Sequence, residues 1–120
     1  VASNSTLSVN RNSTAATTFG LDVNGPLAGT GTLTVTSLNA STSNATLYLK
    51  AAAGTVGGHS AFTGNVNVRN GAILASNHAT ALGTTANVDL ADGTVLSVGA
   101  SQTLGGLTNT TTTTNTRALR

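Results

Sequence analysis

The strongest constraint on the fold is a unit that occurs nearly twice between residues 60 and 107. Residues 60–83 read SAFTGNVNVRNGAILASNHATALG, and residues 84–107 read TTANVDLADGTVLSVGASQTLGGL. Each copy contains an alternating apolar and polar stretch, an Asn-Gly or Asp-Gly turn, a second short apolar strand, and a leucine beside a glycine. Such self-similarity, at a period of about 20 to 30 residues, is typical of a solenoid. The repeat therefore predicts stacked β-coils rather than a globular sandwich.

The same alternation occurs in earlier parts of the chain. Residues 6–9, 19–23, 30–36 and 46–50 each alternate apolar with small or polar residues, and polar loops separate them. Successive side chains of a strand point to opposite faces, so the apolar set of each strand is predicted to point inward. The predicted core ladder consists of Leu33, Val35, Leu47, Leu49, Val66, Val68, Val88, Leu90, Leu96 and Val98.

The amino-acid sequence of the repeat resembles that of a known repeat family. Residues 61–68 read AFTGNVNV, residues 70–73 read NGAI, and residues 81–84 read ALGT. This run closely resembles the autotransporter-associated β-strand repeat, and residues 28–35 (AGTGTLTV) are similar to it more weakly. The resemblance implies a right-handed parallel β-helix in a secreted bacterial surface or passenger protein. It carries no catalytic signature, and the outer-membrane barrel that usually follows a passenger has no counterpart in the sequence.

The composition agrees with a thin and regular core. The chain has 120 residues, of which 2% are aromatic and 7% charged, with no Cys, Met or Trp. A compact globule of this length would normally need large side chains at its centre. Disordered low-complexity chains share this composition, but they do not keep strand periodicity. We therefore expect an all-β domain over residues 1–107, a right-handed parallel β-helix of about four to five coils. Residues 108–120 are expected to form a Thr-rich tail.

Charge and residue usage exclude several kinds of partner. Five basic and three acidic side chains are scattered singly and give a net charge of +2. Nucleic-acid binding would require clustered Lys and Arg, often with aromatics, and neither occurs. Without cysteine there is no disulfide framework. No run is long and apolar enough to span a bilayer, and no signal peptide precedes Val1. Together with the resemblance, this predicts a secreted or cell-surface protein in a mature or excised form.

The ionisable residues do not form a catalytic pattern. Asp89 and Asp92 flank a turn, and His59 and His78 lie in expected loops. Polysaccharide-acting β-helix enzymes use clustered carboxylates, as an acid pair or with calcium. Asp92 precedes a glycine and is most simply a turn residue, whereas Asp89 alternates with apolar residues and is expected to face solvent. No nucleophile elbow or phosphate-binding loop occurs. We therefore predict no catalytic residue, no metal and no cofactor.

Neither end of the chain resembles a solenoid cap. Caps hide the open backbone groups of the last coil. Residues 6–9 form a plain alternating strand, and residues 110–116 are strand-prone and uncharged. A strand-prone tail beside an open edge is suited to pairing with a neighbouring subunit. We therefore predict head-to-tail contacts between copies, with residues 1–10 or the tail crossing between them. The candidate contact residues are Leu7, Val9, Thr110, Thr112 and Thr114.

Three functions are compatible with these observations. The first, which we expect, is a non-enzymatic subunit of a self-assembling bacterial surface fibre. The second is a passenger or adhesin segment that binds a host or a cell-surface glycan. The third is a polysaccharide-acting enzyme, for which an acid/base pair is lacking. Ice binding would require the threonines of residues 30–36 to recur on successive coils, and they do not.

Overall fold

The computed structural model describes residues 1, 3–9, 19–24, 27–37, 45–49, 61–78, 81–91, 93–110 and 118–119. For residues 9, 19, 45, 49, 118 and 119 it describes the backbone alone. Within these ranges there are twelve β-strands and no helix, which confirms the all-β class. The strands are β1 (Ser5–Val9), β2 (Phe19–Val23), β3 (Ala28–Gly29), β4 (Leu33–Ser37), β5 (Ala45–Leu49), β6 (Ala61–Phe62), β7 (Asn65–Arg69), β8 (Ile73–Ser76), β9 (Asn87–Leu90), β10 (Val95–Val98), β11 (Gly106–Asn109) and β12 (Ala118–Leu119).

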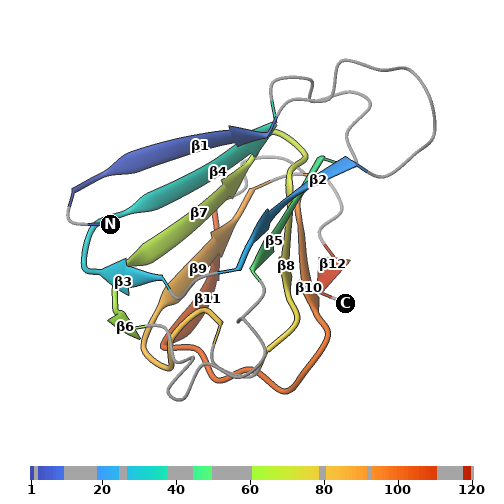
Figure 1. The fold of residues 1–120 in the computed structure, drawn as a ribbon. Coiled ribbons are helices and arrows are strands. Elements are labelled where there is room, and N and C mark those ends of the chain that lie inside the picture. Colours follow the sequence, from blue (N-terminus) through green and yellow to red (C-terminus); the bar gives the residue numbers. More distant parts are fainter. Residues whose placement is uncertain are drawn as a thin grey trace.

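Most of these strands belong to two five-stranded sheets. Sheet A has the order β1-β4-β7-β9-β11, and sheet B has the order β12-β10-β8-β5-β2, while β3 pairs with β6. All pairs are parallel. Figure 1 shows sheet A on one side of the molecule and sheet B on the other. We use the word layer for one strand of sheet A with the following strand of sheet B: β1/β2, β4/β5, β7/β8, β9/β10 and β11/β12. This arrangement is compatible with a β-solenoid.

The repeated unit of the sequence corresponds to two neighbouring layers. Asn65 on β7 pairs with Asn87 on β9, and Ile73 on β8 pairs with Val95 on β10. Paired residues are therefore 22 positions apart in both sheets. The next layer is offset by 19 positions in sheet A, where Asp89 pairs with Thr108. The two copies of the repeat thus stack directly on each other, and the layers differ in length.

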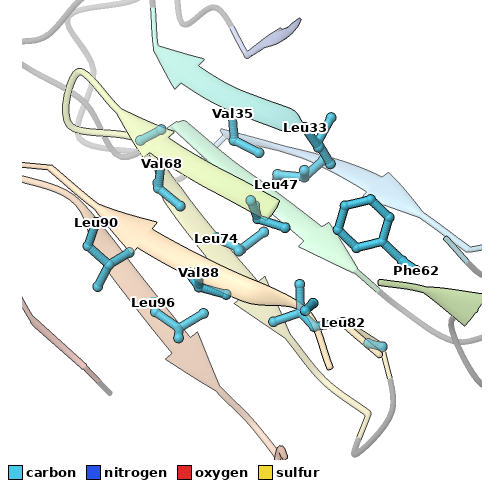
Figure 2. Close-up of a cluster of buried hydrophobic side chains, with 14 residues drawn as sticks. Leu33, Val35, Leu47, Phe62, Val68, Leu74, Leu82, Val88, Leu90 and Leu96 are labelled. Atoms are coloured by element: carbon cyan, nitrogen blue, oxygen red, sulfur yellow. The ribbon is translucent and has the colours of Figure 1, made fainter. Parts of the chain in front are cut away.

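The parallel register aligns inward side chains into columns, as expected for strands whose side chains alternate between faces. The columns meet in one apolar cluster that contains residues of both sheets (Figure 2). Phe62 and Leu82, which the predicted ladder did not include, are fully buried in the same cluster. The two columns of sheet A are Ser5–Leu33–Val66–Val88–Leu107 and Leu7–Val35–Val68–Leu90–Asn109, and sheet B has the column Leu21–Leu47–Leu74–Leu96.

Most residues of the predicted core ladder are buried. The buried members are Leu33, Val35, Leu47, Val66, Val68, Val88, Leu90 and Leu96. Val98 is only half-buried; in the described part of the chain, β12 pairs with Val95 and Leu96 of β10. The backbone of Leu49 pairs within sheet B between Val23 and Ser76, and its side chain lies outside the described part.

The predicted Asn-Gly turn joins the two sheets. Ala72 N donates a hydrogen bond to Arg69 O at 3.1 Å, and Asn70 and Gly71 between them have φ values of 52° and 69°. Positive φ at both central residues favours Asn and Gly, because other side chains are strained there. In a hairpin such a turn would pair its flanking strands. Here β7 and β8 belong to different sheets, so the turn carries the chain from sheet A to sheet B.

Small residues form the corner that leads into sheet A. They precede the first inward residue of each sheet A strand by two positions, and they are Ser3, Gly31, Gly64, Ala86 and Gly105. A Cβ on Gly64 would overlap the carbonyl oxygen of Gly31 in the preceding layer and the ring of Phe62. The corner therefore requires residues with little or no side chain, because the backbones of successive layers approach closely there.

The expected boundary after Leu107 falls inside β11. Thr108 and Asn109 pair with Asp89 and Leu90 of β9, and Ala118–Leu119 pair with β10. The described part of the Thr-rich tail therefore adds a fifth layer to the chain's own sheets.

Candidate functional site

The two terminal layers expose apolar side chains that are buried elsewhere in the same columns. Leu21 on β2 is 43% exposed, whereas its register partner Leu47 is fully buried. Leu107 on β11 is 47% exposed, whereas its partner Val88 is fully buried. Among the described residues, Leu21 and Leu107 are the large hydrophobic residues that are exposed. Both point along inward columns, so their exposure results from their position at the ends of the stack.

The last layer also contains an apolar hollow. It has a volume of about 410 Å³. Its lining includes the half-buried Val98 and the exposed Leu107. The residues that line it are Leu96, Val98, Gly99, Ala100, Ser101, Gln102, Leu104 and Leu107. A hollow of this composition can accommodate apolar side chains.

The strands of the terminal layers are the edges of the sheets. In the described part of the chain, β1 and β2 have one neighbour each at one end of the stack, as do β11 and β12 at the other. Edge strands of this kind present backbone N–H and C=O groups to which a further strand can add. Each end thus combines exposed apolar side chains with backbone groups suitable for parallel pairing.

A polar cluster on the outer face of sheet A connects three strands through Asp89. Arg69 Nη2 on β7 donates to Asp89 Oδ2 at 2.5 Å, and Arg69 Nη1 donates to the main-chain oxygen of Asp89 at 3.1 Å. Thr108 Oγ1 on β11 donates to Asp89 Oδ1 at 2.9 Å. Thr110 Oγ1, just after β11, donates to Oδ2. The carboxylate therefore lies outward, as expected, but is engaged by neighbours on both sides rather than by solvent alone.

The pKa of Asp89 reflects two opposing effects. Partial burial raises the pKa of this carboxyl group. Hydrogen bonds from Thr110, Thr108 and Arg69, together with the positive charge of Arg69, lower it. The second effect is the larger, so the pKa lies below its ordinary value. Asp89 is consequently ionised at neutral pH, and its oxygens are occupied by three donor side chains.

Next to this cluster lies a polar hollow of about 410 Å³. Two of its lining residues are hydrogen-bonded to each other: Asn87 Nδ2 donates to Asn65 Oδ1 at 3.3 Å. Amide and hydroxyl groups of this kind can hydrogen-bond a neutral polar ligand such as a sugar. The lining residues are Asn65, Asn67, Asn87, Asp89, Thr108, Asn109 and Thr110.

The predicted contact residues lie at both ends of the stack. Leu7 on β1 is half-buried and packs against the core. Thr110, predicted to reach a neighbouring copy, is exposed and bonds to Asp89 of its own chain. The side chain of Val9 and the residues Thr112 and Thr114 lie outside the described part.

Of the ionisable residues considered as catalytic or metal-binding candidates, His78 is exposed after β8 and Asp89 belongs to the polar cluster. His59 and Asp92 lie outside the described residues. In the described ranges, no three His, Cys, Asp or Glu residues come together as a metal site would require. The same ranges contain no helix long and apolar enough to cross a membrane.

The ion pair between Arg69 and Asp89 was not predicted from the sequence. The two residues are 20 positions apart. The sequence offered one signal: β7 and β9 occupy corresponding places in the two copies of the repeat, and both residues are outward residues of these strands.

Comparison with protein-family models, with curated proteins and with solved structures finds no match to this chain. The resemblance to the autotransporter-associated repeat therefore stays a prediction.

Proposed function

We propose that this chain is a right-handed parallel β-helix that assembles end to end into an extracellular fibre of a bacterial surface, without enzymatic activity. One observation supports the proposal above all others. At each end of the stack one inward column ends in an exposed leucine: the sheet B column ends at Leu21 in the first layer, and a sheet A column ends at Leu107 in the last. Stacking the last layer of one copy on the first layer of the next would continue the columns and bury both residues.

End-to-end stacking would bury apolar surface and pair backbone groups at the same contact. Burying an exposed leucine stabilises an interface by up to about 1.5 to 3 kcal/mol. Parallel pairing of β11 with β1 of the next copy would also satisfy backbone groups along both edges of sheet A. The two surfaces are different, so the contact is heterologous, and stacking along the axis of the layers lets each copy add to the next without closing a ring. Repetition of such a contact gives a filament.

The described part of the tail favours stacking over strand exchange. Thr108 and Asn109 pair with β9 of their own chain, and Ala118–Leu119 pair with their own β10. A copy that contributed this segment to a neighbour would give up these pairs. We therefore place the contact between terminal layers, with β11 remaining in its own chain.

The direct test uses two variants that each block one end. Leu21→Glu places a charge on the first layer, and Leu107→Glu places one on the last. Each variant alone should remain unassembled at concentrations where the wild type forms filaments in negative-stain electron microscopy. Thr63→Glu is the matched control, because Thr63 is exposed but belongs to neither terminal layer; it should assemble like the wild type.

Mixing the variants tests the polarity of the contact. Leu21→Glu retains an intact last layer, and Leu107→Glu retains an intact first layer. Head-to-tail stacking therefore predicts one-to-one heterodimers in sedimentation velocity, and no longer species. Dimers of a single variant alone would contradict the heterologous contact. A wild type that stays monomeric at all concentrations would contradict the fibre function itself.

A second candidate function is that of a passenger or adhesin segment that binds a glycan. The observation in its favour is the polar hollow beside Asp89, which is lined by amide and hydroxyl groups. The described residues that line it include no aromatic side chain on which a sugar ring could stack. If the chain remains monomeric, binding of neutral oligosaccharides, measured by perturbation of the Asn65 and Asn87 side-chain amide signals, would support this alternative.

A further inference from the structure

The last layer is held to the stack differently from the layers before it. Strands β4, β7 and β9 of sheet A have a neighbour on each side, whereas β11 has one in the described part of the chain. Its residues after Gly106 are exposed, including Leu107 at 47%. Apolar burial therefore stabilises β11 less than it stabilises the inner strands. Polar contacts consequently account for a larger share of its attachment.

Besides the backbone pairing of β9 with β11, side-chain hydrogen bonds to Asp89 connect β11 to the rest of sheet A. The two carboxylate oxygens of Asp89 accept hydrogen bonds from Thr108 and Thr110 on one side. On the other side, Arg69 of β7 holds the same carboxylate by an ion pair at 2.5 Å. The side chains of Arg69 and Asp89 are 29% and 16% exposed, so solvent screens this pair less than a fully exposed one. One carboxylate thus joins the third, fourth and fifth layers.

We infer that Asp89 is an acid-sensitive latch for β11: its ionised carboxylate holds the last layer in place, and protonation releases that layer before the rest of the stack opens. A protonated carboxyl group loses its attraction to Arg69 and accepts weaker hydrogen bonds from the two hydroxyls. In the described residues, Arg69 is the charged side chain that faces Asp89 from β7, and neither β9 nor β11 contains another ionisable side chain. The latch therefore has a single titrating group.

The direction of the pH effect follows from the contacts. Because the donors stabilise the charged form, the pKa of Asp89 is lowered while β11 is attached. The stabilisation of the attached β11 is fully present at pH values above the ordinary pKa of an aspartate carboxyl group, about 4. This stabilisation is lost as the pH falls through the lowered pKa that Asp89 has while β11 is attached. Acid therefore favours detachment of β11, which exposes the edge of β9 and removes Leu107 from beside its register partner Val88.

This detachment would also control assembly, and that step rests on the proposed function. Leu107 belongs to the surface on which the next copy is proposed to stack. A detached β11 no longer presents Leu107 in its column, so acid should disfavour growth at this end. The attachment of β11 to its own chain is independent of whether copies assemble.

The test is hydrogen exchange of the β11 amides, followed by NMR in the Leu21→Glu background to exclude assembly. Protection factors, which correct for the intrinsic pH dependence of exchange, should fall for β11 relative to β7 between pH 6 and pH 3. In Asp89→Asn the lower protection should already be present at pH 6, by roughly tenfold, and should change little with pH. Asp22→Asn is the control, since Asp22 lies on β2 in sheet B; it should behave like the parent.

Two results would overturn the latch. One is wild-type protection of β11 in Asp89→Asn at pH 6. The other is loss of protection in β7, β9 and β11 together on acidification, which would indicate global unfolding. Thr110→Val supplies a second variant that leaves the carboxylate intact and should lower β11 protection in the same direction. Because these measurements are made on unassembled chains, their outcome is separate from that of the filament experiment.

Discussion

Truncation of two leucines in the same column should have very different effects on stability. Leu21 and Leu47 are register partners on β2 and β5, but Leu21 is 43% exposed and Leu47 is fully buried. Leu47→Ala removes buried atoms and leaves a cavity, which should cost about 2 to 5 kcal/mol. Leu21→Ala removes the same atoms from a site that water already reaches. About 0.8 kcal/mol per carbon, reduced for the exposed fraction, gives about 1 to 1.5 kcal/mol.

The measurement is urea denaturation of both variants in dilute solution, where copies do not associate. The expected difference of about 2 kcal/mol is large against a total stability of about 5 to 15 kcal/mol. Equal costs for the two variants would contradict the assignment of Leu21 to an open end. Raising the protein concentration adds a second comparison. The gap between the wild type and Leu21→Ala should widen with concentration, because a stacked neighbour would bury Leu21 in the wild type.

Three further outcomes are expected. Val88→Asp should lower the melting temperature strongly, because it buries an unpaired charge, whereas Asn87→Asp on the exposed side of β9 should lower it little; similar melting temperatures would contradict the inward assignment. Gly64→Ala should cost about 1 to 3 kcal/mol in urea denaturation, since its Cβ would overlap Gly31 O, while Thr63→Ala at the neighbouring exposed position should be nearly neutral. The wild-type chain should cleave no member of a polysaccharide panel, and release of reducing ends would count against a structural function.

Local features of the fold could be predicted from the sequence because they depend on short-range chemistry. The alternation in residues 65–69 is sufficient to place Val66 and Val68 on one face, since successive side chains of a strand point to opposite sides. The Asn70-Gly71 pair indicates a turn because both residues tolerate positive φ, and both adopt it. The small residues before each sheet A strand were visible in the sequence as well. Their purpose became clear only when Gly64 was seen against the backbone of Gly31.

Position in the stack, in contrast, was decided by the tertiary structure. The sequence treats Leu21 and Leu47 alike, since both alternate with polar residues in five-residue strands. Their exposures differ because, among the described strands, Leu47 has a layer on each side and Leu21 has a layer on one side. The contact between Arg69 and Asp89 likewise depends on which residues of neighbouring strands become register partners, and the offset varies from layer to layer. Alternation fixes the face on which a side chain lies, whereas pairing between distant strands fixes its neighbours and its access to water.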